Sequence, residues 1–228
     1  MYYFEKLDLN KFEMLSQNAD LTKALGNIED SGGGFSLEEF WQDAKAEIRE
    51  NLLEIIKIGA GFRRQLFDDY TFKIGTKSKL EADFECAMRI IEVIFENPED
   101  FYVVRSRAGE IAGFWYLYGI NWARKADEFD SAKVHKVPVS CCFAGCLKKK
   151  FWGKPAREIM KKLLDEVFIG RDLRKLKCET FSTNPYIEGF LREFGFRLEG
   201  VLKEETMAAN RVCDVKIWGF CKKEYSAC

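Results

Sequence analysis

The sequence is poor in proline and histidine and has almost no net charge. Its 228 residues include 4 Pro and 1 His, and the formal net charge is -1. A dedicated nucleic-acid-binding protein normally has a clear basic excess, so this balance argues against nucleic acid as a partner. The sequence also shows no signal peptide and no long apolar run. We therefore expect a cytoplasmic protein without a membrane partner.

Paired cysteine motifs are absent as well. The chain has 8 Cys, none spaced as Cys-x-x-Cys, which favours free thiols in a reducing compartment over a disulfide framework. Cys141, Cys142, Cys146 and His135 could in principle bind zinc. Because adjacent cysteines on a strand point to opposite faces, we expect no metal site there.

What the chain does contain is enough apolar surface for a sizeable core. Hydrophobic residues make up 47% of it, and 20 residues are Phe. A chain of this length can fold as one domain of ordinary size with an extension. We place the extension at residues 1–66 and the main domain at residues 67–228.

The extension is predicted to be mainly helical. Ser36-Leu37-Glu38-Glu39 is a capping box, which marks a helix start. Gly59-Ala60-Gly61 marks the end of that helix. The earlier segment Met1–Leu15 fits either a strand or a helix. One face of the helix is apolar and consists of Phe40, Trp41, Ala44, Ile48, Leu52, Ile55 and Ile56.

The main domain combines further helices with strands. A helical stripe of apolar residues runs from Leu80 to Phe95 and ends before Asn97-Pro98. The other apolar segments are predicted to be strands: Phe72–Gly75, Phe101–Arg107, Ile111–Ile120, Ser131–Phe143, Leu176–Thr183, Val201–Met207 and Val212–Cys221.

The most informative segment begins with the glycine turn Phe151-Trp152-Gly153-Lys154-Pro155-Ala156, which leads directly into a helix. Such a turn presents unpaired N–H groups to an anion such as a phosphate. The run Lys148–Lys150 would add positive charge beside it. The helix has one apolar face, formed by Ala156, Ile159, Met160, Leu163, Leu164, Val167 and Phe168.

The same turn has a simpler interpretation. Proline is favoured at the first position of a helix, so Gly-Lys-Pro turns open many helices that bind no ligand. A single glycine is also a weak motif on its own. The residues that follow the turn therefore decide between the two interpretations.

Those residues resemble the GNAT superfamily of acyl-CoA N-acyltransferases, most closely its ribosomal-protein alanine acetyltransferase branch. That branch has an aromatic-Trp-Gly-Lys turn, then an Asn, a Gly-Phe pair, a Glu-Gly pair and a later Asp, preceded by a Gly-Glu-x-x-Gly-Phe hairpin. The resemblance implies an α/β fold with a mixed, mostly antiparallel sheet flanked by helices. The matching residues are Gly109–Phe114, Phe151–Lys154, Asn184, Gly195-Phe196, Glu199-Gly200 and Asp214.

Three departures from the family pattern affect the expected chemistry. Pro155 stands where the family has a residue with a backbone N–H, so one donor to a pyrophosphate is lost. Ile187 replaces the Ser that can act as an acid in the closest branch. Leu191 stands where other branches place a Tyr.

The resemblance implies acetyl-CoA as the co-substrate and an amine as the acceptor, with no metal. The segment Phe143–Leu147 would pair with the pantetheine arm, and an N–H near Cys142 or Phe143 would stabilise the oxyanion. The residues implied in cofactor binding are Phe143, Gly145, Cys146, Leu147, Lys150, Phe151, Trp152, Gly153, Lys154, Ala156 and Asn184.

An attacking amine must lose a proton, so a general base is needed directly or through water. His135 and Glu179 are the candidates for this base. Ser182 and Tyr186 are candidates to protonate the leaving thiolate, and Asn184 would bind the arm or a water near the thioester. Each side chain also has an ordinary role as a packed or solvated residue, and the resemblance does not select among them.

Three classes of function follow. The first is an N-acetyltransferase that acts on a primary amine of a protein, a peptide or a small molecule. The second is a catalytically weak or inactive binding or assembly protein on the same scaffold, which Pro155 and Ile187 would suit. The third, a nucleic-acid-associated module using Lys148–Lys150, conflicts with the overall charge. A homodimer is compatible with all three.

Overall fold

A computed structural model provides the structure of the chain. It describes residues 2–6, 46–62, 66, 79–96, 98–126, 134–208 and 211–225. The predicted strand Phe72–Gly75, the capping box at Ser36–Glu39 and the apolar residues Phe40, Trp41 and Ala44 lie outside these residues.

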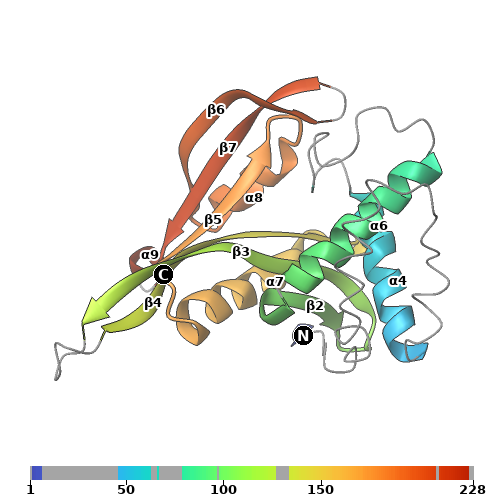
Figure 1. Cartoon of the computed structure of the whole chain (residues 1–228), viewed down its shortest axis with the longest axis horizontal. Coiled ribbons are helices and arrows are strands. Elements are labelled where there is room, and N and C mark those ends of the chain that lie inside the picture. The colour runs from blue at the N-terminus through green and yellow to red at the C-terminus, as the bar shows by residue number, and fades with distance from the viewer. Residues whose placement is uncertain are drawn as a thin grey trace.

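Seven strands of the described residues form one sheet in the order β1-β2-β3-β4-β5-β7-β6 (Figure 1). Neighbouring strands are antiparallel except β4 and β5, which are parallel. The predicted mixed, mostly antiparallel sheet is thus confirmed. The strands are β1 Tyr2–Lys6, β2 Phe101–Ser106, β3 Ile111–Ala126, β4 Val134–Leu147, β5 Lys175–Phe181, β6 Arg197–Ala208 and β7 Arg211–Cys221.

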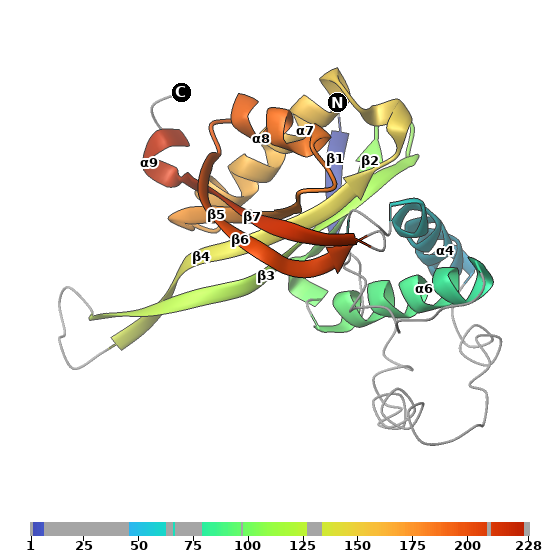
Figure 2. The same ribbon diagram turned by 90° about the horizontal axis from the view of Figure 1, so that it is seen from above.

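Helices cover both faces of this sheet. Figure 2 shows α7 and α8 on one side and α4 and α6 on the other. The longer helices are α4 Ala46–Gly61, α6 Lys79–Glu96, α7 Lys154–Asp165 and α8 Tyr186–Glu193. Shorter elements are the 3-10 turns η2 Pro98–Asp100 and η3 Lys149–Phe151, the π-helical turn η4 Glu166–Gly170 and α9 Lys222–Tyr225.

Each face of the sheet has its own core cluster. On the α7 side, Trp115, Leu117 and Phe143 pack against α7 and α8, with Trp218 fully buried. On the α4 side, Phe101 and other strand residues pack against both helices. The helical residues of this second cluster are Leu52, Ile55, Ile58, Cys86, Ile90, Val93 and Ile94.

Helix α7 follows the apolar pattern of its sequence. All seven residues of the predicted stripe are buried, and Pro155 occupies an early position where its missing N–H costs no helical hydrogen bond. The stripe continues through η4, where Val167 and Phe168 are fully buried. The predicted amphipathic helix is therefore confirmed.

The two predicted hairpins are also present, with different limits. The turn at Ala108-Gly109 joins β2 to β3, and Gly109 has a φ of 82°. Strand β3 extends to Ala126 instead of ending at Ile120, and β4 ends at Leu147 instead of Phe143. The distal parts of β3 and β4 form a two-stranded arm that projects from the rest of the sheet (Figure 2).

The described parts of the predicted extension join the main sheet and its core. Strand β1 pairs with β2, with Tyr2 opposite Ser106, so the segment left open between strand and helix is a strand. Helix α4 ends at Gly61, as predicted, and packs against α6 and β3. The division into two domains at residue 66 stays a prediction.

Within the described residues, no helix is long and apolar enough to cross a membrane. The thiols of the described part are all free cysteines. Five of them are buried: Cys86, Cys141, Cys142, Cys178 and Cys213.

Close packing of β3 on β4 predicts the effect of a methyl group at Gly113. A Cβ there would lie 2.0 Å from the Cys146 carbonyl oxygen and 2.9 Å from the Leu147 Cα. Because backbone atoms cannot move aside cheaply, Gly113→Ala should lower the free energy of unfolding by about 1–3 kcal/mol. Urea denaturation measures this change.

Gly189 in α8 provides the matched control. A Cβ at Gly189 meets no heavy atom within 4 Å. Alanine is a better helix former than glycine, so Gly189→Ala should raise the free energy of unfolding by about 0.5–1 kcal/mol. Equal effects of the two substitutions would contradict the close contact between β3 and β4.

Candidate active site

The central feature of the candidate site is the separation of two parallel strands. The ladder between β4 and β5 comprises only the pairs Ser140–Lys175, Cys141–Leu176 and Cys142–Lys177. Beyond it, β4 stays with β3 as far as Leu147, whereas β5 stays with β7 as far as Phe181. The two strands therefore diverge from the pair Cys142–Lys177, which we call the vertex.

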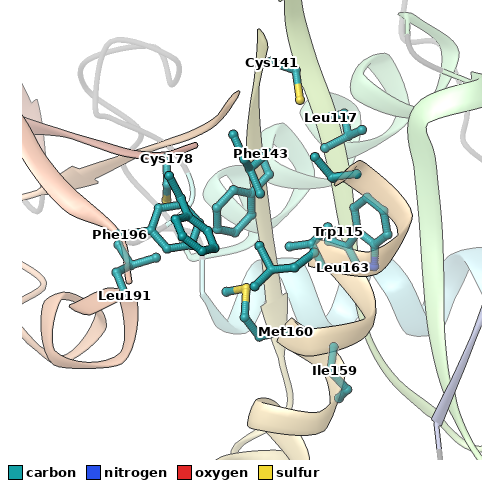
Figure 3. Packing of buried hydrophobic residues seen from close by; sticks show 14 of the residues in the cluster. Trp115, Leu117, Cys141, Phe143, Ile159, Met160, Leu163, Cys178, Leu191 and Phe196 are labelled. Carbon is teal, nitrogen blue, oxygen red and sulfur yellow. The ribbon is translucent and has the colours of Figure 1, made fainter. Parts of the chain in front are cut away.

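On the α7 side of the sheet, side chains fill the space between the diverging strands. Phe143 of β4 and Phe196 at the end of the α8 turn are in ring contact, with centroids 5.8 Å apart. Figure 3 shows Phe143 between Cys178, Leu191 and Phe196 on one side and the residues of α7 on the other. All of these side chains belong to one buried cluster. The separation is thus part of the packed core.

The divergence leaves backbone groups of β4 without a strand partner. The Lys148 N–H donates to the Ala112 carbonyl at 2.9 Å, so the backbone groups of Lys148 face β3. Backbone groups alternate between the two edges of a strand, so those of Leu147 and Gly145 face the gap. The Leu147 carbonyl accepts a hydrogen bond from Trp152 Nε1 at 3.0 Å. We call Gly145 and Leu147 the open edge.

The open edge leads into the glycine turn. In this turn the Phe151 N–H donates to the Lys148 carbonyl and the Trp152 N–H to the Lys149 carbonyl, at 2.9 and 3.1 Å. Gly153 then adopts φ 74° and ψ -127°, a conformation that favours glycine. Next, α7 begins, and the Arg157 N–H donates to the Gly153 carbonyl at 3.2 Å.

Three N–H groups at this helix start are available to a ligand. No described residue accepts a hydrogen bond from the amide of Gly153, Lys154 or Ala156. Pro155 has no N–H to offer. Free amides at a helix N-terminus, together with the helix dipole, bind phosphate and other anions. The turn that the sequence singled out therefore has the geometry of an anion site with one donor removed.

Carboxylates hold two of the three lysines that were expected to supply charge. Lys148 Nζ lies 2.6 Å from Glu54 of α4 and 3.3 Å from Glu110, and Lys150 also pairs with Glu110. The hydrogen bond from Lys150 lowers the pKa of Glu110, so this carboxylate stays ionised at neutral pH. The run Lys148–Lys150 was expected to add positive charge beside the turn. Carboxylates neutralise two of its three lysines, Lys148 and Lys150.

On the α4 side of the sheet, four polar side chains gather at the vertex. Tyr118 of β3 is opposite Cys142, and Cys142 is opposite Lys177 of β5. Glu179 lies two residues beyond Lys177 and therefore on the same face of β5. The side chains of Tyr118 and Lys177 lie beside the Cys142 thiol, and both favour its thiolate form. We call these four residues the vertex cluster.

The charges of the vertex cluster are divided unequally. Burial, and then the charge of Glu179, raise the pKa of Tyr118 well above its usual range. Burial also raises the pKa of Cys142, and Lys177 opposes this shift. Tyr118 and Cys142 are therefore protonated at neutral pH and can donate, whereas Glu179 is exposed to solvent. The cluster combines a carboxylate with proton donors.

The structure brings only some of the proposed catalytic residues to the vertex. Glu179 belongs to the vertex cluster. His135 lies on the distal arm opposite Lys125, and the seven residue steps from it to Cys142 span about 23 Å. Ser182 follows β5, where its N–H donates to the Asp214 carbonyl and its Oγ accepts from the Asp214 N–H.

The remaining two candidates lie at the start of α8. Tyr186 is the first residue of this helix and is 86% exposed. Asn184 is half-buried, and its N–H donates to the Phe181 carbonyl at 2.9 Å. Their side chains therefore belong to the β5 arm of the divergence, beyond the vertex.

The residues proposed for cofactor binding fall into two groups. Gly145, Leu147, Gly153, Lys154 and Ala156 present backbone groups to the gap or the turn, as described above. Five of the other six are engaged elsewhere. Alternation turns the backbone groups of Cys146 toward β3, Lys150 is in an ion pair, and Trp152 Nε1 donates to the Leu147 carbonyl. The side chains of Phe143 and Phe151 are buried in the core, and Asn184 lies just before α8.

Sequence reasoning missed Tyr118 and Lys177. Lys177 could have been found, because it shares a strand face with Glu179 by simple alternation. Tyr118 could not, because its place opposite Cys142 depends on the register of β3 against β4.

The described fold is similar to solved N-acetyltransferase structures. Spermidine N-acetyltransferase from Vibrio cholerae in complex with CoA and spermine matches with a TM-score of 0.56 and 20% identity, over 78% of this chain and 94% of that one. A dodecameric structure of the same enzyme matches with a TM-score of 0.52 and 21% identity, over 78% and 91%. The protein smu.2055 from Streptococcus mutans UA159 matches with a TM-score of 0.52 and 16% identity, over 76% and 94%.

No protein-family model and no curated protein sequence matches the chain. At these identities the structural likeness establishes the fold, which is the GNAT fold. The fold places the diverging strands, the glycine turn and helix α7 in one architecture.

The contact between Lys177 and Cys142 can be tested by thiol chemistry. The Lys177 charge favours the Cys142 thiolate, so Lys177→Met should raise the pKa of Cys142 further. The rate at which Cys142 reacts with a small methylthiolating reagent, followed by mass spectrometry from pH 7 to pH 10, should then fall at each pH.

Lys175→Met serves as the matched control. Lys175 lies two ladder pairs earlier and pairs with Glu199 at 2.6 Å. Its removal should leave the reactivity of Cys142 unchanged. A Cys142 pH profile that responds equally to both substitutions would show that the Lys177 contact is not specific.

Proposed function

We propose that this chain is an N-acetyltransferase of the GNAT superfamily that transfers an acetyl group from acetyl-CoA to a primary amine. One observation carries the proposal: the open edge of β4 runs directly into the free amides of the glycine turn. A ligand with an extended polar arm and a phosphate-rich end fits this continuous path. The CoA bound by the Vibrio cholerae enzyme has this chemistry.

Backbone groups would hold most of the cofactor. The amides of Gly153, Lys154 and Ala156 would bind the pyrophosphate, aided by the dipole of α7. Gly145 and Leu147 would hydrogen-bond the pantetheine arm as a missing strand. The strand from Leu147 to Phe143 is four residue steps long, which is about 13 Å, and it leads to the vertex. The thioester would therefore lie next to Cys142 and Lys177.

The vertex cluster would carry out the proton transfers. Glu179 would accept the proton of the attacking amine, directly or through a water. A strand N–H near Phe143 would stabilise the oxyanion of the tetrahedral intermediate. Tyr118, which burial keeps protonated, would donate to the leaving thiolate. The general acid in this assignment is a hydroxyl group on β3, in place of one on α8.

The α8 positions that supply an acid elsewhere in the superfamily are apolar here. Leu191 is fully buried in the core cluster, and Ile187 packs against the same cluster. Neither position can hold a polar group at the vertex without losing core contacts. The chain therefore needs another acid, which supports Tyr118 in that role.

We assign the acceptor by its chemical class alone, as a primary amine. The Vibrio cholerae enzyme was crystallised with spermine. The narrower resemblance to the ribosomal-protein alanine acetyltransferases would instead give a protein N-terminus. Both acceptors present a primary amine, which is the only group that the proposed chemistry requires. The homodimer expected from the sequence stays a prediction.

One observation favours the second candidate, a binding protein on this scaffold. Pro155 removes a donor from the anion site, and Glu110 holds Lys148 and Lys150 beside it. A protein that binds CoA without transferring acetyl would fit these features. Binding and turnover must therefore be measured separately.

Acetyl-CoA should bind and stabilise the folded chain. Ligand at about a hundred times its dissociation constant adds roughly 2.7 kcal/mol to the free energy of unfolding, which raises the Tm visibly. Differential scanning fluorimetry with millimolar acetyl-CoA, CoA or ADP measures this shift. A release assay for CoA thiol with a panel of amines then measures turnover.

The outcomes separate the candidates. A shift with turnover supports the acetyltransferase, and a shift without turnover on any amine supports the binding protein. The absence of a shift with both acetyl-CoA and CoA would contradict both.

Two substitutions in the turn should act in opposite directions on CoA affinity. Gly153→Val places a branched side chain at a φ of 74° and crowds the phosphate, so affinity should fall far more than stability. Pro155→Gly restores an N–H donor and should keep or improve affinity. Isothermal titration calorimetry with CoA measures both changes.

Gly189→Ala, at an exposed position of α8 where a Cβ meets no heavy atom within 4 Å, is the control and should leave CoA affinity unchanged. If Pro155→Gly abolished CoA binding in a folded protein, the pyrophosphate would not lie at this turn.

A further inference from the structure

Lys177 is an amine at the place where the proposed reaction needs one. It forms the last pair of the β4–β5 ladder, opposite Cys142, on the α4 side of the sheet. Its side chain is half-buried, and its charge lies close enough to the Cys142 thiol to oppose the rise in the pKa of that thiol. Glu179, the proposed general base, follows two residues later on the same face of β5.

Within the described residues, no carboxylate forms an ion pair with Lys177. This distinguishes it from its neighbours, because Lys175 pairs with Glu199 at 2.6 Å and Lys216 pairs with Glu188. Lys149 and Lys154 are exposed at the glycine turn, at the phosphate end of the proposed ligand path. Among these amines only Lys177 lies at the vertex.

We propose that Lys177 is a self-acetylation site, whose Nζ accepts the acetyl group from acetyl-CoA bound along the open edge of the same chain. This inference rests on the proposed function, because it requires the thioester to lie at the vertex. It adds a modification site in the chain itself to the transfer to external amines.

The reaction balances without a further reactant. The Lys177 ammonium passes one proton to Glu179, which releases it to water. The neutral Nζ then attacks the thioester carbonyl and an N–C bond forms. The nitrogen passes its second proton to Glu179, which again releases it to water, and the C–S bond breaks. CoA leaves as its thiol after taking a proton from Tyr118, which regains one from solvent. The products are an acetamide on Lys177 and free CoA.

Acetylation would change the vertex cluster itself. The acetamide has no charge, so the cluster loses its only cation and keeps the Glu179 carboxylate. Cys142 loses the positive charge that favours its thiolate. The added acetyl group also occupies space on the face from which an external amine would approach. Acetyl-CoA would thus modify Lys177 and thereby change the face on which an external amine binds.

The test uses the full chain incubated with acetyl-CoA in the absence of any amine acceptor. Intact-mass spectrometry should show one added acetyl group, and peptide mapping should place it on Lys177. The rate per molecule should not depend on protein concentration, because donor and acceptor belong to one chain. Glu179→Gln should slow it by about a hundredfold or more, the usual loss of a general base.

Matched variants identify the residue. Lys177→Arg keeps the charge and should abolish the added mass, and its thermal shift with acetyl-CoA reports whether the cofactor still binds. Lys175→Arg, on the same strand face, should leave the modification unchanged. The heat-unfolded chain under the same conditions reports chemical acetylation. Peptide mapping of the natural chain tests the proposal even if a variant fails to fold.

The outcomes separate failure of this inference from failure of the proposed function. A chain that shows the acetyl-CoA thermal shift and acetylates an added amine, but leaves Lys177 unmodified, overturns the inference alone. Lysines modified equally in the folded and unfolded chains also overturn it. A chain with no acetyl-CoA shift and no acetylation of any amine overturns the proposed function and this inference together.

Discussion

The contact between Phe143 and Phe196 holds β4 and β5 apart. Two parallel strands that have begun to pair would continue to do so, because each added pair satisfies backbone groups at little further cost. Here the ladder stops after Cys142–Lys177 because side chains of α7 and α8, together with Phe196, occupy the space beyond it. The burial of these side chains in the hydrophobic core therefore offsets the free-energy cost of leaving the backbone of the open edge unpaired.

That single constraint also organises the two faces of the sheet. The α7 face is closed by packed side chains, so a ligand in the gap meets a solid wall there. The α4 face carries the polar vertex cluster. A donor lying in the gap and an acceptor approaching from the α4 face would thus meet at the vertex from different directions. The geometry separates their binding sites without a second domain.

The sequence predicted the elements whose pattern is local. Helix α7 has a complete apolar face, and the β2–β3 hairpin has a glycine in its turn, so both could be identified without tertiary information. Strand β1 could not be assigned, because its five residues become a strand only by pairing with β2, about a hundred positions later. Local patterns cannot contain a partner so distant.

The candidate site divides in the same way. The turn at Gly153 was identifiable from residue type and spacing alone. The vertex cluster depends on the relative register of three strands, β3, β4 and β5, which no single-strand pattern encodes. By residue type, both His135 and Glu179 were candidate bases. Only the pairing of β4 shows that His135 lies on the distal arm and Glu179 near the vertex. The partners of Lys148 and Lys150 likewise come from α4 and the β2–β3 hairpin.

Trp152 gives the turn a built-in optical reporter. Its indole is 50% exposed, donates to the Leu147 carbonyl and lies with its ring centre 6.0 Å from that of Phe62. Trp115 and Trp218, by contrast, are buried, so their emission is insensitive to solvent changes at the turn. Occupation of the open edge alters the surroundings of Trp152 directly. Trp122 on the distal arm is also exposed, at 57%, so the part of the red-edge emission change that Trp152→Phe removes reads out that occupation.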